Sequence, residues 1–143
     1  MIKHSITLKK TLYLIAIFCY SIVLSQVSIS TLDRTVYQDA KTNNNYVKTE
    51  TSKEFNFFVF NQDYTMLTLT NEARTTPYRL QMLHQENSQQ KFIFEITDEE
   101  NQKMELTLNL EEKTISLYID LLYENGSIVP TVIVYNISNI SEI

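Results

Sequence analysis

Side chains that commonly carry out catalysis or bind metals are sparse in this chain of 143 residues. His84 is one of two histidines, and Cys19 is the single cysteine. A zinc site needs several imidazole or thiolate ligands close together, and a disulfide needs two cysteines, so neither can be built within the chain. We therefore expect no metal site and no disulfide.

The sequence around His84 favours a structural role for its imidazole. His84 continues a series of period two that begins with Tyr78, Leu80 and Met82, which would place all four residues on the apolar face of one strand. A histidine on such a face is more often a hydrogen-bonded core or rim residue than a catalyst.

Acidic side chains are plentiful, but none is set apart by its surroundings as a catalytic carboxylate. Asp98-Glu99-Glu100 offers oxygens for calcium, yet it lacks the spaced ligands and turn glycine of an EF-hand loop and is typical of a solvated hairpin tip. Gly126-Ser127 lacks the second glycine of a nucleophile elbow. Because Gly126 is the only glycine, phosphate-cradling loops and dinucleotide fingerprints are excluded. We predict no catalytic residues, no cofactor and no enzymatic activity.

The net charge argues against a polyanionic partner. Lys3, Lys9 and Lys10 account for 3 of the 12 basic side chains, whereas all 17 acidic side chains lie at or after Asp33. From Gln26 onward the chain therefore carries 9 basic against 17 acidic side chains, a net charge of −8. Binding to nucleic acid or to anionic lipid needs clustered lysine and arginine, so we expect neither partner.

The first 25 residues have the order of a secretory signal peptide. A basic segment ending at Lys10 precedes the almost wholly apolar residues 11–24, which we expect to form a signal helix. The residues before Gln26 place the cleavage site between Ser25 and Gln26. An apolar run of about 14 residues is shorter than the roughly 20 that span a bilayer, so we expect a cleaved leader and no membrane span in the mature chain.

Cleavage at this site would remove Cys19 and leave a mature chain without cysteine. An exported domain without disulfides is more typical of bacteria than of eukaryotic extracellular fluids. We therefore expect a bacterial protein of the periplasm, the cell surface or the extracellular medium.

The remainder of the chain has the pattern of an antiparallel β domain. In the clearest run, residues 103–110, Met104, Leu106, Leu108 and Leu110 alternate with polar residues, and only a half-buried strand has period two. Polar turns separate such runs at regular intervals. We predict strands near residues 54–61, 64–70, 76–85, 90–97, 102–110, 114–123 and 128–137, with one or two weaker strands between 34 and 51.

Connections this short join antiparallel neighbours and leave no room for crossover helices. The sequence therefore predicts an all-β fold, a single antiparallel meander of about seven to nine strands curled into a barrel or half-barrel, with a two-layer sandwich as the alternative. The apolar residues of 114–123 also fall at helical spacing, so a helix stays open there, although the residue types favour a strand. Residues 26–53 would form an N-terminal segment with the weaker strands, and residues 54–143 the meander.

In shape, this meander resembles the small lipocalin-like β-barrels exported by bacteria. The chain has no tryptophan and therefore lacks the glycine–tryptophan motif near the first lipocalin strand. The resemblance implies an interior that can hold a small apolar ligand. We expect Phe92, Phe94, Leu106 and Leu108 to face that ligand.

The alternative function is a structural or protein-interaction module of the cell envelope. Pro130 marks a candidate edge strand or bulge, because proline cannot donate to a ladder, and an open edge could bind an envelope protein. Tyr118 and Tyr123 lie on the less apolar phase of their strand and could form a patch for a partner.

Four phenylalanines within residues 55–60 are the densest aromatic segment. Alternation sends Phe55 and Phe57 to one face of the strand, and Phe58 and Phe60 to the other. This predicts a strand that is buried on both faces.

Overall fold

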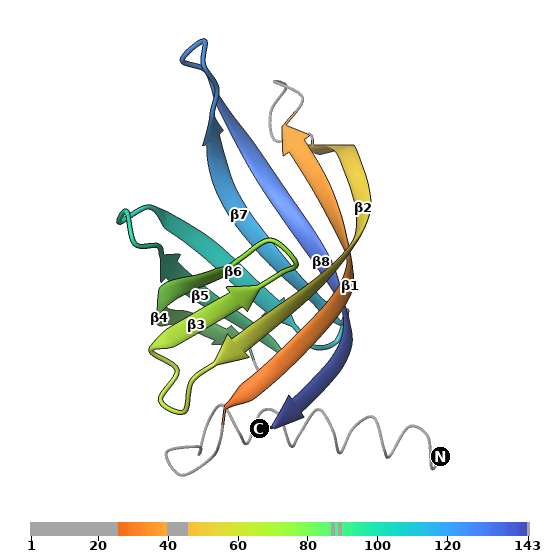
Figure 1. The fold of residues 1–143 in the computed structure, drawn as a ribbon, viewed down its shortest axis with the longest axis vertical. Helices are drawn as coiled ribbons and strands as arrows, with labels where there is room; N and C mark the ends of the chain where they lie inside the picture. Colours follow the sequence, from red (N-terminus) through yellow and green to blue (C-terminus); the bar gives the residue numbers. More distant parts are fainter. Residues whose placement is uncertain (1–25, 40–45, 87, 89, 143) are drawn as a thin grey trace.

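The computed structural model describes residues 26–39, 46–86, 88 and 90–142. The expected signal helix, with Cys19 and Ser25, lies outside the described residues, of which Gln26 is the first. The described chain is all-β: eight antiparallel strands follow one another and close into a barrel (Figure 1). The strands are β1 (Val27–Asp39), β2 (Tyr46–Phe60), β3 (Met66–Thr70), β4 (Thr75–Glu86), β5 (Lys91–Thr97), β6 (Lys103–Asn109), β7 (Thr114–Leu122) and β8 (Ile128–Glu142).

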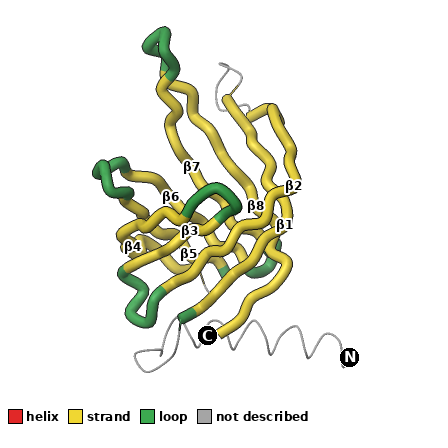
Figure 2. Tube along the Cα trace, viewed as in Figure 1, coloured by secondary structure: helices red, strands yellow, loops and turns green. Residues whose placement is uncertain are grey.

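The predicted meander barrel is confirmed. Each strand pairs with the next in antiparallel register, and β1 also pairs with β8, which completes the ring. Loops in the described chain are confined to the strand ends (Figure 2), and a sandwich is excluded. Residues 114–122 form a strand, so the helical alternative there is wrong. No helix among the described residues has the length and apolar character to cross a membrane.

The strands differ greatly in length, and the difference shapes the barrel. β1, β2 and β8 have 13, 15 and 15 residues, whereas β3, β5 and β6 have 5, 7 and 7. Ladder pairing of β2 with β3 covers only Phe57 to Phe60, which leaves residues 46–56 without a partner on that side. Figure 1 shows β7, β8, β1 and β2 continuing beyond the shorter strands as a curved ribbon.

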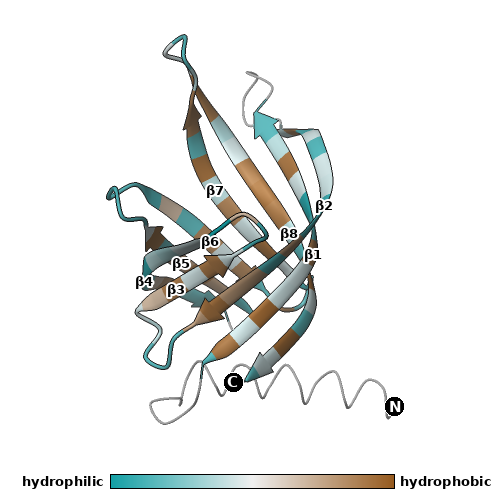
Figure 3. Ribbon diagram, in the orientation of Figure 1, coloured by the Kyte–Doolittle hydropathy of each residue, from teal (hydrophilic) through white to brown (hydrophobic). Residues whose placement is uncertain are grey.

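Apolar side chains fill the interior of the closed part. Apolar and polar residues alternate along the strands (Figure 3), and the inward positions of all eight strands contribute to one hydrophobic core. Burial of this apolar surface is the main favourable contribution to folding, at about 25 cal/mol per Å². The members of the core are Val27, Ile29, Phe58, Phe60, Leu67, Leu69, Leu80, Phe92, Phe94, Ile96, Leu106, Leu108, Leu110, Ile115, Leu117 and Tyr135.

The first two strands are longer than the weak strands predicted between residues 34 and 51. β1 begins at Val27 and β2 at Tyr46, so the expected boundary between residues 53 and 54 falls inside β2. In β1, small serines alternate with Val27 and Ile29 and stay buried, a pattern that hydrophobicity alone does not reveal.

The prediction that Pro130 marks an edge strand is wrong. Its strand, β8, is paired with β7 on one side and with β1 on the other. Pro130 pairs with Asp120 of β7, and the β1 ladder ends one residue away, at Thr131 opposite Gln38. The missing N–H of proline thus falls just beyond the end of a ladder, where it costs no hydrogen bond.

Candidate functional site

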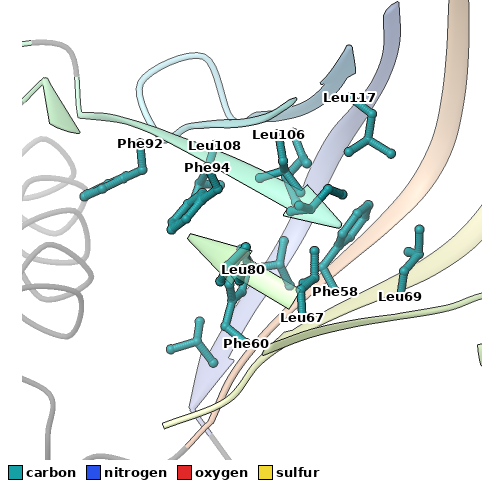
Figure 4. Packing of buried hydrophobic residues seen from close by; sticks show 14 of the residues in the cluster. Phe58, Phe60, Leu67, Leu69, Leu80, Phe92, Phe94, Leu106, Leu108 and Leu117 are labelled. Atoms are coloured by element: carbon teal, nitrogen blue, oxygen red, sulfur yellow. The ribbon is translucent and has the colours of Figure 1, made fainter. Parts of the chain in front are cut away.

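The residues expected to face a ligand lie on the inner surface of the barrel. Phe92 pairs with Leu108 and Phe94 with Leu106 across β5 and β6, and all four are fully buried. The ring centroids of Phe94 and Phe60 are 5.7 Å apart, and Figure 4 shows these side chains gathered in one cluster. Two clefts in the described part of the chain lie elsewhere, and neither includes any of the four in its lining.

The larger of these two clefts opens where β6 and β7 separate. The β6–β7 ladder begins at the pair Glu105–Tyr118, and beyond it the strands diverge because β7 continues into the long ribbon. The space has a volume of about 510 Å³. Its walls are formed by Tyr46, Leu83, Glu95, Gln102, Lys103, Met104, Glu105, Tyr118, Ile119, Asp120, Pro130 and Thr131.

Two tyrosines and several apolar side chains form the body of the cleft. Tyr46 and Tyr118 are 37% and 43% exposed, so both rings are accessible. Leu83, at 52% exposed, falls in a break of register where β4 passes from Met82 to His84. Such a bulge turns a side chain away from the regular alternation, and here it places an apolar residue in the cleft wall.

The cleft carries an excess of negative charge. Glu95, Glu105 and Asp120 line it together with one basic residue, Lys103. The Nζ atom of Lys103 lies 3.7 Å from Oε1 of Glu95, which balances that pair. Glu105 and Asp120 have no ion pair among the described residues.

These surroundings change the pKa of Tyr118. Burial raises the pKa of its hydroxyl above the usual value, and the negative charge of Glu105 and the neighbouring Tyr46 and Glu112 raise it further. A neutral phenol can therefore both donate and accept hydrogen bonds in the cleft over the physiological pH range.

A smaller cleft adjoins the first. It has a volume of about 300 Å³ and shares Glu95 and Lys103 with the larger one. Its far wall includes Arg79, whose Nη2 donates a hydrogen bond of 2.7 Å to Oδ1 of Asn101. Lys103 and Glu95, which form an ion pair, therefore contribute to the walls of both clefts.

A network of charged side chains lies on the inner face of β1 and β2, next to the apolar core. Register places Arg34, Glu50 and Glu54 on the same face as the core residue Phe58. The Arg34 guanidinium lies 3.4 Å from Oε1 of Glu50 and 3.8 Å from Oε2 of Glu54. Burial raises the pKa of Tyr135 to about 12, an effect that Arg34 partly offsets by its charge and that Glu54 reinforces. This network closes the apolar core with polar groups that satisfy one another.

A buried polar pair lies between this network and the apolar core. Thr31 and Asn56 face each other across β1 and β2 at 0% and 1% exposure. The Asn56 Nδ2 donates a 3.3 Å hydrogen bond to the carbonyl oxygen of Glu54, whereas Thr31 Oγ1 has no protein partner among the described residues. A single water suffices to satisfy a hydroxyl of this kind.

The predicted position of His84 on the apolar face is wrong. The bulge after Met82 shifts the alternation, so that His84 pairs with Ile93 and its side chain is 59% exposed. Its Nε2 lies 3.5 Å from Oε1 of Glu86. Periodicity counted along the sequence cannot reveal a bulge, because the extra residue has no compositional mark.

The segment rich in phenylalanine follows the predicted alternation but is not buried on both faces. Phe58 and Phe60 are fully buried, whereas Phe55 and Phe57 are 39% and 38% exposed on the outer surface. Their rings meet edge to face with centroids 4.7 Å apart.

The acidic segment at Asp98 forms the predicted hairpin tip, where Asp98 Oδ1 accepts hydrogen bonds from two backbone N–H groups.

Comparison with known proteins found no family model, no curated protein and no solved structure that matches this chain. Within the described ranges, no group of three or more His, Cys, Asp or Glu side chains is arranged to hold a metal ion.

Tyr118 and Tyr123, which were expected to form one patch, do not line the same space. Tyr118 lines the larger cleft. Tyr123 lies past the end of β7, where its hydroxyl accepts a 2.7 Å hydrogen bond from Gln38 Nε2.

Proposed function

We propose that the protein is a non-enzymatic binding barrel that holds a small ligand with an apolar body. The observation that carries the proposal is the cleft of about 510 Å³ between β6 and β7. Sites for small molecules commonly occupy about 300–1,000 Å³ and combine apolar walls with a few polar groups. The cleft does not include Phe92, Phe94, Leu106 and Leu108, which we assign to the supporting core.

The side chains of the cleft suit such a ligand. Leu83, Met104 and Ile119 supply apolar contact from three different strands. Tyr118 and Tyr46 offer flat rings with hydroxyl groups at their ends, so they can pack against an apolar body and hydrogen bond to a polar substituent. Each of these side chains belongs to a β-strand, which limits the entropy lost on binding.

A fluorescent probe tests this assignment. N-phenyl-1-naphthylamine is neutral, apolar and dark in water, and we expect its emission to rise when it binds the full chain. Leu83→Ala and Tyr118→Ala should each weaken binding at least fivefold, since each removes a wall of the cleft. Tyr123→Ala is the matched control, because it removes an exposed tyrosine outside the cleft. Equal binding by all four proteins would exclude the cleft as the site.

We further propose that the protein is exported, on the order of the basic and apolar segments in residues 1–25. Mass spectrometry of the protein recovered from its host measures the N-terminus directly. We expect it to begin at Gln26, and a retained Met1 would contradict the proposal. Analysis of small molecules that copurify with the same preparation identifies the natural ligand.

A second candidate function is an interaction module of the cell envelope. It rests on the exposed Phe55 and Phe57, which lie at or next to the part of β2 that is paired with β1 but has no partner on its other side. Sedimentation of the full chain should then show self-association or binding to an envelope protein, which Phe55→Ser and Phe57→Ser weaken. Lys48 and Lys53 on the same strand oppose such contacts, because charged side chains protect an open edge.

A further inference from the structure

The larger cleft contains accessible aromatic rings next to carboxylates that have no counter-ions. This combination favours a ligand with a positive charge. Resting on the proposed function, we infer that the ligand carries a cationic amine or ammonium group beside its apolar body. Glu105 and Asp120 are the carboxylates that receive this group, and Tyr118 lies between them.

The strand register fixes this arrangement. Glu105 is the cross-strand partner of Tyr118, and such partners hold their Cβ atoms about 4.5–5.5 Å apart. Asp120 follows Tyr118 by two residues in β7, so both side chains leave the same face of the strand. One tyrosine ring therefore has a carboxylate across the ladder and another along its own strand.

The charges in the cleft favour a cation over an anion. Lys103 is engaged by Glu95, which leaves Glu105 and Asp120 as the uncompensated charges of the site. An ammonium group gains from both carboxylates and from the negative face of a tyrosine ring. A carboxylate in the same place would meet two like charges, so binding of an anionic ligand is opposed.

A series of three probes with one ring separates charge from apolar contact. At neutral pH 2-phenylethylamine is a cation, 2-phenylethanol is neutral and phenylacetate is an anion. We expect titration of the isotopically labelled full chain, followed by NMR at low ionic strength, to give shifts at Tyr118 and Ile119. The amine should bind at least tenfold more tightly than the alcohol, and phenylacetate most weakly. Added salt should narrow the difference, because the carboxylates are partly exposed.

Two double variants locate the source of the preference. Glu105→Gln with Asp120→Asn should lower the affinity for the amine to within about twofold of the affinity for the alcohol. The affinity for the alcohol should not change. Glu99→Gln with Glu100→Gln changes the net charge equally at the exposed hairpin tip, outside the cleft, and should leave the preference intact. Circular dichroism verifies that both variants keep the β fold.

The outcomes separate the two proposals. Equal affinity for the amine and the alcohol, with shifts in the cleft, overturns the cationic ligand and leaves the binding function standing. Shifts elsewhere for every probe, with unchanged binding of N-phenyl-1-naphthylamine by Leu83→Ala, overturn the binding function itself. Loss of the preference in the hairpin-tip variant would show that overall charge, not the cleft, attracts the amine, and would also overturn the inference.

Discussion

Tyr135 links the acid–base chemistry of the barrel interior to its stability. It is 4% exposed, and its ring meets Phe58 edge to face with centroids 5.1 Å apart. Burial raises the pKa of its hydroxyl from 10.0 to about 12, because an ionised phenolate in this position would lose its hydration. Replacing Tyr135 with phenylalanine removes this titration and keeps the ring.

The sign and size of the effect follow from linkage. The folded state holds the proton more tightly than the unfolded state, so the contribution of Tyr135 is complete below about pH 10 and is lost as the pH rises towards 12. A shift of about two pKa units corresponds to about 2.7 kcal/mol in full. At about pH 11 the loss is about 1.4 kcal/mol, since only part of the interval has been crossed.

Urea unfolding followed by far-ultraviolet circular dichroism measures this contribution. Between about pH 9 and pH 11, the free energy of unfolding of the natural protein should fall by about 1.4 kcal/mol more than that of Tyr135→Phe. Tyr123→Phe, altered at an exposed position, serves as the control and should follow the natural protein. Parallel pH profiles for the natural protein and Tyr135→Phe would refute the assignment of a raised pKa to Tyr135.

Three further substitutions, two of them compared with a control substitution, test the core and the turns by urea unfolding at neutral pH. Phe94→Ala should lower the free energy of unfolding by about 3–5 kcal/mol, because Phe94 is fully buried. Phe57→Ala, on the outer face, is the control and should lower it by less than about 1.5 kcal/mol. Similar losses for the two variants would contradict the assigned faces. Lys113→Gly should raise the free energy of unfolding by up to about 1 kcal/mol, since Lys113 has a φ of 57° in the β6–β7 turn, and a decrease would show that the side chain itself stabilises the turn. Asp98→Ala should lower the free energy of unfolding by about 1 kcal/mol, because Asp98 Oδ1 accepts backbone hydrogen bonds of 2.9 and 2.8 Å. The exposed neighbour Glu99→Ala is the control, and an equal loss there would exclude these hydrogen bonds as the cause.

Period two was sufficient to predict most of the fold. Residues 103–110 alternate cleanly because the apolar side chains of β6 all point to the core, whereas the opposite face of the strand carries polar residues. Val27 and Ile29 alternate too, but they are separated by serines that the neighbouring strands bury. Alternation predicts a strand well where the exposed face is strongly polar, and poorly where that face carries small residues.

The cleft was much harder to predict than the fold. Tyr118 was recognised by its place on the less apolar phase of its strand, but Tyr46 and Leu83 were not. Tyr46 comes from the start of β2, far from Tyr118 in sequence, and only the divergence of the long strands brings both to one space. Leu83 depends on a bulge, and the length of a strand beyond its partner is likewise a property of the ladder rather than of any single residue.

The closure between β1 and β8 has a consequence for how the molecule forms. Val27 pairs with Glu142, so the ends of the described chain meet side by side, while every other ladder joins strands adjacent in sequence. The hairpins can form in any order as the chain emerges, but the ring must wait for its final segment, and this contact carries the largest loop-closure entropy in the fold. A chain that stops before β8 would leave β1 and β7 with bare backbone groups, and so would be prone to pair with other copies.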